Sequence, residues 1–241
     1  MQKLVGAATV VALGVLVVFA LVVAPADALQ GDAQRLMYVH VPAAWLAYLA
    51  FFVTALCSAL WLWRRTRSTT WDLLAGASAE VGVVFTALTL VLGSLWGRPI
   101  WGTWWEWDAR LTTTAVLFFL YLGYLALRRL GGTVDQRAKR SAIAALIAFV
   151  DVPVVHFSVT WWETLHQDAT VFNPDLDVQI RGSMAFTLVW SVVAFTLLYG
   201  ALVWYRFVLA DLEEGRDERE LEAAIAERIR TSSTPPEAVT V

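Results

Sequence analysis

Six long runs of apolar residues follow one another along the chain, and short polar segments separate them. A membrane-spanning helix needs about twenty predominantly apolar residues, and each run is long enough to supply them. The pattern therefore predicts an all-α polytopic membrane protein with six transmembrane helices. The runs extend over about Leu4–Ala24, Ala43–Trp63, Leu73–Leu95, Leu111–Leu127, Ala142–Val159 and Met184–Tyr205.

The composition excludes a soluble domain. Of the 241 residues, 59% are hydrophobic and 16% are charged, whereas a soluble domain carries about a quarter charged residues. Mean hydropathy is +0.60. The formal net charge is −3, and the cations occur in short blocks, so no nucleic-acid partner is expected. Because Cys57 is the single cysteine, the chain can form no internal disulfide, no Cys-x-x-Cys-His haem attachment site and no thiolate cluster.

The basic residues indicate how the helices are oriented. Fourteen of the 18 Lys and Arg lie before the first run or after the second, fourth and sixth runs. The other four, Arg35, Arg98, Arg110 and Arg181, lie in the loops after the first, third and fifth runs. Because basic loops stay in the cytoplasm, we predict that both termini are cytoplasmic and that those three loops are on the outer side.

The first apolar run has two interpretations. Lys3 precedes it and the small-residue segment 24–28 follows it, as in a secretory signal peptide. Its apolar core is longer than that of a typical signal peptide, so an uncleaved first span is expected. Cleavage would leave the orientation of the other five helices unchanged.

Polar residues dominate after the sixth run. Within residues 206–230, Leu221, Ile225 and Ile229 recur at four-residue spacing with charges between them, which predicts a short cytoplasmic amphipathic helix. This helix is either a solvated stalk or a docking site for a cytoplasmic partner. Residues 231–241 are predicted to be disordered. The expected organisation is therefore a transmembrane domain over residues 1–205, the amphipathic helix and a tail.

Tryptophan is concentrated in two of the outer loops. Seven of the 13 Trp lie there, namely Trp96, Trp101, Trp104, Trp105, Trp107, Trp161 and Trp162. An aromatic belt at the membrane surface is the alternative explanation, but one helix end needs only one or two anchoring rings. A crowd of flat rings instead predicts a platform for a large, flat, apolar ligand. Residues 96–110 are called the tryptophan loop below.

All three histidines lie on or near the same predicted outer side. His40 lies just before the second apolar run, with Pro42 expected in the first turn of that helix, and His166 lies in the third outer loop. Two imidazoles beside an aromatic platform suggest axial ligation of haem iron, because neutral imidazole is a good iron ligand. His156, near the outer end of the fifth run, ranks third as a ligand and has a structural role as its alternative.

The two propionates of a haem require cations, and arginine binds a carboxylate at two points. Arg35 lies shortly before His40, and Arg110 lies at the start of the fourth span, so both are predicted to bind propionates. For Arg98 and Arg181, surface ion pairs with acidic residues are an equal alternative. The outer N-termini of the second, fourth and sixth helices also favour anions.

The tryptophan loop carries a family resemblance. Residues 101–112 read Trp-Gly-Thr-Trp-Trp-Glu-Trp-Asp-Ala-Arg-Leu-Thr and resemble the WWD motif of haem-handling membrane proteins, most closely that of the cytochrome c maturation protein C (CcmC) family. Residues 35–45 and 161–167 resemble the two histidine segments of that family. Glu106 departs from the apolar residue that is usual there. Larger relatives that attach haem to apocytochromes continue the motif with Pro-Val-Glu-Asn and need more spans than this length allows.

The resemblance implies a scaffold that holds haem b transiently at the outer face of the cytoplasmic (inner) membrane. His40 and His166 would ligate the iron, and Arg35 and Arg110 would pair with the propionates. The motif residues that would cover the porphyrin are Trp101, Gly102, Trp104, Trp105, Trp107 and Asp108. The implied function is delivery of haem to a periplasmic haem chaperone during maturation of c-type cytochromes.

The resemblance also implies partners. They are the chaperone, a small single-span membrane subunit, the permease and ATPase subunits of an ABC transporter, and membrane lipid. The sequence has no Gly-x-x-x-x-Gly-Lys motif, so ATP would be used by a partner and the chain is not expected to be an enzyme. Two alternatives stay open. One is a b-type redox cytochrome, whose histidines usually lie within the spans; the other is a haem-transporting permease subunit, which the scarcity of ionisable residues in the spans disfavours.

Overall fold

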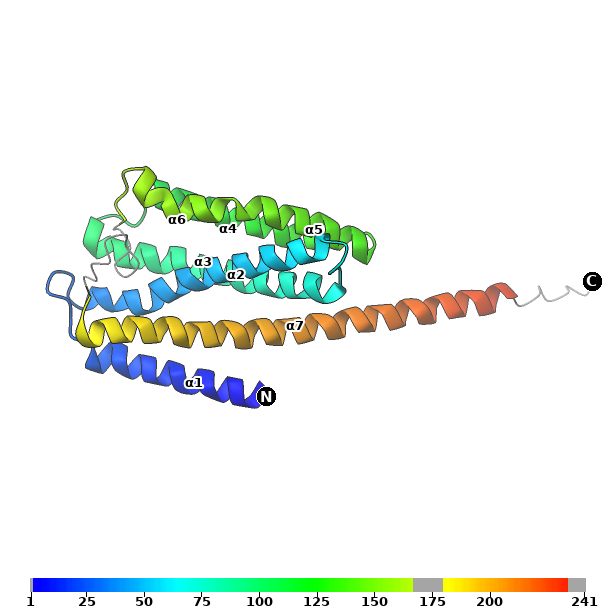
Figure 1. The fold of residues 1–241 in the computed structure, drawn as a ribbon, viewed down its shortest axis with the longest axis horizontal. Helices are drawn as coiled ribbons and strands as arrows, with labels where there is room; N and C mark the ends of the chain where they lie inside the picture. The colour runs from blue at the N-terminus through cyan, green and yellow to red at the C-terminus, as the bar shows by residue number, and fades with distance from the viewer. Residues whose placement is uncertain (1, 167–179, 234–241) are drawn as a thin grey trace, which may run out of the picture.

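The computed structural model describes residues 2–166 and 180–233, which form helices packed lengthwise (Figure 1). They are α1 (Gln2–Val18), α2 (Met37–Leu62), α3 (Thr69–Trp101), α4 (Ala109–Arg128), α5 (Val134–Phe149), α6 (Asp151–Trp161) and α7 (Gly182–Ser233). A π-helical turn, η1 (Phe19–Val23), continues α1, and a 3-10 turn, η2 (Asp32–Leu36), leads into α2. Six helical segments of the described chain are long and apolar enough to cross a membrane, with α5 and α6 together forming one of them. The predicted all-α, six-span fold is confirmed.

Local sequence explains where several helices begin and end. Ser68, Asp108 and Thr133 cap the N-termini of α3, α4 and α5 through their side-chain oxygens. Thr133 and Gln136 form a reciprocal capping box at α5. Gly102 ends α3 with φ +77°, a left-handed conformation that favours glycine.

The fifth apolar run forms two helices in line because Pro153 interrupts it. Pro153 has no backbone N–H to donate to the carbonyl of Phe149, the last residue of α5. Val150 instead donates its backbone N–H to the Ile147 carbonyl at 3.2 Å, one residue closer than in a regular α-helix. The break leaves Asp151 at the first position of α6.

Helices α2 and α3 form the centre of the bundle, with α1 and α7 packed on one side and α4, α5 and α6 on the other (Figure 1). The rings of Phe51 in α2 and Tyr121 in α4 stack at 3.6 Å between centroids. A Cβ added to Gly82 in α3 would lie 2.6 Å from the Phe51 ring. The close approach of α2 and α3 at this level therefore requires glycine.

The bundle has two chemically distinct ends. One carries His40, His166 and the tryptophan loop and is called the histidine end; the other, called the arginine end, carries the turns around Arg64–Arg67 and Arg128–Arg140. The start of α1 and the end of α7 both point toward the arginine end (Figure 1). The compartment that each end faces remains a prediction.

The predicted amphipathic segment 206–230 is continuous with the sixth span. Helix α7 runs without interruption from Gly182 to Ser233 and extends beyond the other helices (Figure 1). Leu221, Ile225 and Ile229 are exposed on this extension. Residues 234–241 of the predicted tail lie outside the described residues.

A buried ion-pair network ties four helices together at the arginine end. Asp72 in α3 has a side chain that is only 3% exposed and accepts hydrogen bonds from both terminal nitrogens of Arg128 in α4, at 2.5 and 3.0 Å. Arg137 in α5 bridges Asp72, at 3.2 Å, and Glu214 in α7, at 2.8 Å. We call these four residues the Asp72 network. Because each charge has an opposite partner, the network can persist with little water.

Candidate functional site at the histidine end

The structure places His40 inside a helix rather than in the loop where the sequence suggested it. Helix α2 begins at Met37, so Pro42 lies inside the helix instead of in its first turn. A proline this close to the helix start removes only one helical hydrogen bond, the one to the Tyr38 carbonyl. Burial of Met37 and Tyr38, which are 2% and 0% exposed, offsets that loss.

The imidazole of His40 is enclosed by α3. His40 is 8% exposed, and its ring meets the edge of the Trp96 indole at 5.7 Å between centroids. A Cβ added to Gly93 would lie 3.0 Å from His40 Cε1, so the glycine makes room for the ring. His40 Nδ1 is buried and has no hydrogen-bond partner within the described residues. A buried imidazole nitrogen without a partner suits a metal-bound ligand.

The last turns of α3 carry two indoles that face different neighbours. Trp96 donates its indole N–H to the Gln30 side chain at 3.0 Å, which joins α3 to the segment before α2. The Trp101 ring lies over Gly97, where an added Cβ would be 2.7 Å from it. The centroid of the Trp101 ring also lies 6.4 Å from the centroid of the His166 ring. One helix end therefore contacts both of the predicted ligand histidines through Trp96 and Trp101.

The tryptophan loop folds back on α3. Gly102 donates its backbone N–H to the Arg98 carbonyl at 3.1 Å, and Arg98 Nη1 donates to the Gly102 carbonyl at 2.5 Å. The Arg98 guanidinium also lies 5.8 Å from the centre of the Trp104 ring, and Ser94 donates to the Trp104 carbonyl at 2.6 Å. Within the described residues Arg98 forms no ion pair with a carboxylate; it contacts the backbone and the Trp104 ring of the tryptophan loop.

The rings beyond this turn form an exposed aromatic surface. Trp105 and Trp107 meet edge to face at 5.4 Å, and Trp104 and Trp107 are 57% and 77% exposed. Trp105 Nε1 is buried without a hydrogen-bond partner in the described part of the chain. Glu106 is exposed. Indoles this exposed at a helix end are available to a flat apolar ligand or to a partner protein.

Asp108 connects the tryptophan loop with the segment that carries His166. Its Oδ1 accepts a hydrogen bond from the Leu111 backbone N–H at 2.7 Å and so caps α4. Its Oδ2 accepts one from the backbone N–H of Leu165 at 3.1 Å. The motif carboxylate therefore holds the residue directly before His166.

Arg110 reinforces the same junction. Its Nε donates to the Ser158 hydroxyl at 2.9 Å, and its Nη2 donates to the His156 carbonyl at 3.0 Å, so α4 is tied to α6. Both His166 and Arg110 lie within electrostatic range of the His40 ring. The structure thus brings together His40, His166, Arg110 and the tryptophan loop at one end of the bundle.

Arg35 is engaged with the end of the first span. Its Nη1 donates to the carbonyls of Ala20 and Ala24, the latter at 2.9 Å, and its Nε pairs with Asp32 at 2.8 Å. The Ala20 and Ala24 carbonyls are left over at the end of η1, where no further helical N–H follows. Arg35 therefore caps the first span in addition to any role toward a ligand.

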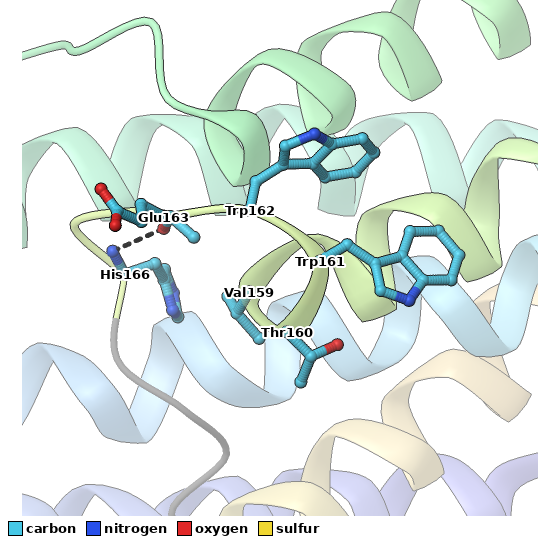
Figure 2. A pocket seen from close by; sticks show the side chains of 7 residues that line it. Val159, Thr160, Trp161, Trp162, Glu163 and His166 are labelled. Atoms are coloured by element: carbon cyan, nitrogen blue, oxygen red, sulfur yellow. Dashed lines mark hydrogen bonds between the residues drawn. The ribbon is translucent and has the colours of Figure 1, made fainter.

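His166 lies beside an open pocket of about 500 Å³ at the end of α6 (Figure 2). Its backbone N–H donates to the Thr164 hydroxyl at 2.8 Å. The pocket is lined by Val159, Thr160, Trp161, Trp162, Glu163, Thr164 and His166. Figure 2 shows the indoles of Trp161 and Trp162 pointing away from the His166 imidazole, so these two rings do not stack on it.

His156 lies apart from this cluster. It is exposed on α6, and its ring meets Phe157 at 4.9 Å and Tyr48 at 6.3 Å. In the described chain, no group of three or more His, Cys, Asp or Glu side chains converges on a metal site. A pair of imidazoles suits a haem iron, because the porphyrin supplies the other four nitrogens.

Three residues that contact the predicted site were not singled out in the sequence. Gly93 and Ser94 lie on the turn of α3 preceding Trp96 and Arg98, and Gln30 lies in the first loop. The position of Gly93 could have been predicted from the sequence, because Gly93 precedes Trp96 by three residues and therefore lies on the same face of the helix. The contact of Gln30 with Trp96 could not have been predicted from the sequence, because it depends on how the first loop folds.

The sequence is similar to a set of haem exporter proteins. Residues 1–222 match the family model described as CcmC, "Heme exporter protein C". "Heme exporter protein C" of Escherichia coli strain K12 is 41% identical over 192 residues, which cover 76% of this chain and 72% of the relative. The protein of that name from Haemophilus influenzae is 40% identical over 209 residues, covering 86% and 82%.

A mitochondrial relative is also similar. The "Putative cytochrome c biosynthesis ccmC-like mitochondrial protein" of Marchantia polymorpha is 38% identical over 169 residues, which cover 70% of this chain and 71% of the relative. The predicted family is thus confirmed, because the CcmC family model matches residues 1–222 of the chain. With its six-span helical fold and its WWD segment at residues 101–112, the chain belongs to the CcmC family.

Proposed function

We propose that this protein binds haem at the histidine end and delivers it to a periplasmic haem chaperone during maturation of c-type cytochromes. Haem is the cargo, and the chain is a binding and transfer scaffold rather than an enzyme. The names of its relatives, which refer to haem export and cytochrome c biosynthesis, support haem handling. Delivery to a chaperone is the finer step, and it comes from the family resemblance of the tryptophan loop.

The observation that carries the proposal is the position of two histidines around one helix end. His40 meets Trp96 and His166 meets Trp101, and both indoles belong to the last turns of α3. His40 also has a buried nitrogen with no partner among the described residues. We infer that the two imidazoles take the axial positions of the iron and that the tryptophan loop covers the porphyrin edge.

Arginine donors would hold the propionates. Arg35 and Arg110 use some of their N–H groups on backbone carbonyls and on Ser158, which fixes the two guanidinium groups in place. Each guanidinium has five N–H donors, so donors remain for a carboxylate. Fixed cations bind an anion at a smaller entropic cost than mobile ones do. Iron chemistry belongs to the bound haem, and the chain contributes position and charge.

The proposed setting is the cytoplasmic (inner) membrane, with the histidine end facing the periplasm. The concentration of Lys and Arg at the arginine end supports this orientation. The proposed partners are the haem chaperone, a small single-span subunit, and the permease and ATPase subunits of an ABC transporter. The exposed Trp104 and Trp107 are available for the chaperone, and the α7 extension reaches toward the proposed cytoplasmic side.

Histidine substitutions test the ligand assignment. The purified wild type is compared with His40→Ala, His166→Ala and the double variant, and His156→Ala serves as the control because its ring lies on α6 outside the cluster. We expect a low-spin bis-imidazole haem spectrum in the wild type and in the control, and its loss in the double variant. Equal haem retention with an unchanged spectrum in the double variant would overturn the assignment.

One observation favours a second candidate, a b-type redox cytochrome. His40 lies within α2, as the haem ligands of such cytochromes do, whereas His166 lies beyond the end of α6. Mixing the haem-loaded protein with a quinol distinguishes the two functions. Electron exchange at catalytic rates supports the redox function, and transfer of haem to the chaperone without such exchange supports delivery.

A further inference from the structure

A groove of about 480 Å³ runs between α4 and α5, away from the proposed haem site. Its floor includes Tyr124 and Ala148, which are 1% and 2% exposed, and its walls include Phe119 and Ile147, which are 67% and 65% exposed. Nothing lies within 4 Å of the position where a Cβ on Gly123 would be, so the groove is open at this glycine. Its surface is almost wholly apolar.

The groove lies in segments that we take to cross the membrane. Helix α4 and the α5–α6 unit are both among the six candidate spans, so the groove faces lipid unless another chain covers it. Its volume limits what can occupy it. A helix about 10 Å across fills a volume of this size with roughly one turn, whereas a spanning helix needs several turns of contact. A single flexible hydrocarbon chain fits the volume better.

One end of the groove meets a cluster of cations. Leu127 and Leu130 line the groove, and their carbonyls accept hydrogen bonds from Arg140 Nη2 at 3.2 and 2.8 Å. Arg140 precedes Ala144 by four residues and so lies on the same face of α5 as the groove. Its Nε is buried and has no hydrogen-bond partner in the described ranges. Arg129, which is exposed, lies between the two leucines in sequence.

An apolar groove that ends at arginines has the chemistry of an anionic lipid. Arg140 binds two carbonyls through Nη2 and makes only a long contact of 3.5 Å to the Gly131 carbonyl through Nη1, so Nη1 and the exposed Arg129 remain as donors for a phosphate. Basic pockets between transmembrane helices at the cytoplasmic surface bind anionic headgroups. We propose that the α4–α5 groove binds one anionic phospholipid, with an acyl chain along Gly123 and Ala144 and its phosphate at Arg129 and Arg140. This site is separate from the proposed haem site and does not depend on it.

Native mass spectrometry of the full-length protein tests the site. The protein is exchanged into detergent with equal amounts of phosphatidylglycerol and phosphatidylcholine that carry the same acyl chains. We expect one retained phosphatidylglycerol, favoured over phosphatidylcholine by about tenfold, because both lipids present a phosphate but only phosphatidylcholine also places a cation beside Arg129 and Arg140. Gly123→Leu fills the groove and should remove the retained lipid. Gly200→Leu on α7 is the matched control, since a Cβ added at Gly200 also meets nothing within 4 Å.

Further variants separate the acyl site from the headgroup site. Arg129→Gln and Arg140→Gln should each reduce the preference for phosphatidylglycerol while some lipid of either kind is still retained. Ala126→Leu fills the groove at a second exposed position, and this variant replaces Gly123→Leu in the experiment if Gly123→Leu fails to fold. Equal retention of the two lipids by the wild type would overturn the proposal, as would lipid retention that both groove-filling variants leave unchanged. Displacement of a stoichiometric membrane polypeptide by these variants would show that a protein helix occupies the groove instead.

Discussion

The carboxylate of Asp108 accepts a hydrogen bond from the backbone N–H of Leu165 at 3.1 Å, although the two residues belong to different loops. The same carboxylate caps α4 through Leu111. Asp108, the acidic residue of the WWD segment, thus has a structural role, because it fixes the position of Leu165, the residue that precedes His166. A carboxylate with two backbone donors links the tryptophan loop to the second predicted haem ligand.

Asp108→Ala should weaken haem binding and stability together. Loss of an N-cap costs about 1 kcal/mol of unfolding free energy, and release of Leu165 should reduce haem affinity by about tenfold. Asp108→Asn keeps an acceptor and should have an intermediate effect. Thermal unfolding and haem titration followed by absorbance measure the two effects.

The control is Thr133→Ala, which removes the N-cap of α5 at the opposite end of the bundle. It should lower the free energy of unfolding by a similar amount and leave haem affinity unchanged. If the two alanine variants lose haem equally, the effect of Asp108 is one of general stability and the positional role is wrong.

Gly93→Ala should separate haem binding from stability. The added methyl group would lie 3.0 Å from His40 Cε1, so the imidazole has to move by a few tenths of an ångström. Alanine in place of glycine within a helix contributes about 0.5–1 kcal/mol of stability. We expect weaker haem binding at unchanged or raised thermal stability.

Gly200→Ala provides the comparison, since an added Cβ there meets nothing within 4 Å. It should gain the same helix stability with full haem binding. Unaltered haem binding and an unaltered haem spectrum in Gly93→Ala would show that the His40 ring has no fixed role at the iron.

Arg98→Gln should loosen the tryptophan loop. The guanidinium contacts the Gly102 carbonyl at 2.5 Å and the Trp104 ring at 5.8 Å, and both contacts are lost in the variant. The expected results are tryptophan emission shifted toward that of water-exposed indole and haem binding weakened by about fivefold. Arg181→Gln, which changes an exposed arginine at the same end, should leave the tryptophan emission unchanged. The same fluorescence in both variants would contradict the role assigned to Arg98.

Asp72→Asn should destabilise the arginine end without affecting the proposed haem site. The substitution leaves Arg128 without an anionic partner, whereas Arg137 keeps Glu214, and breaking a buried ion pair costs about 3 kcal/mol. The exposed pair of Arg216 and Glu220 on α7 is the comparison, because Arg216→Gln should cost at most about 0.5 kcal/mol. Thermal unfolding in detergent measures both changes, and equal stability of the two variants would show that the Asp72 network contributes nothing.

The sequence by itself determined the number of spans, the all-α class and the family, because these depend on local properties. An apolar run of about twenty residues is helical in a membrane whatever surrounds it, since lipid offers no partner for the backbone. The tryptophan cluster and the histidine segments were likewise visible as short motifs. The fifth apolar run was predicted as a single span, and its division has a local cause, the missing backbone N–H of Pro153.

Only the tertiary structure decided what the individual polar side chains contact. The partners of Arg35 are the carbonyls that end the first span, and the partners of Arg110 lie on α6. It also decided that α2 starts before His40, since the gain from burying Met37 and Tyr38 depends on helices elsewhere in the chain. Contacts between segments distant in sequence are set by packing and hydrogen-bond geometry, which no local pattern encodes.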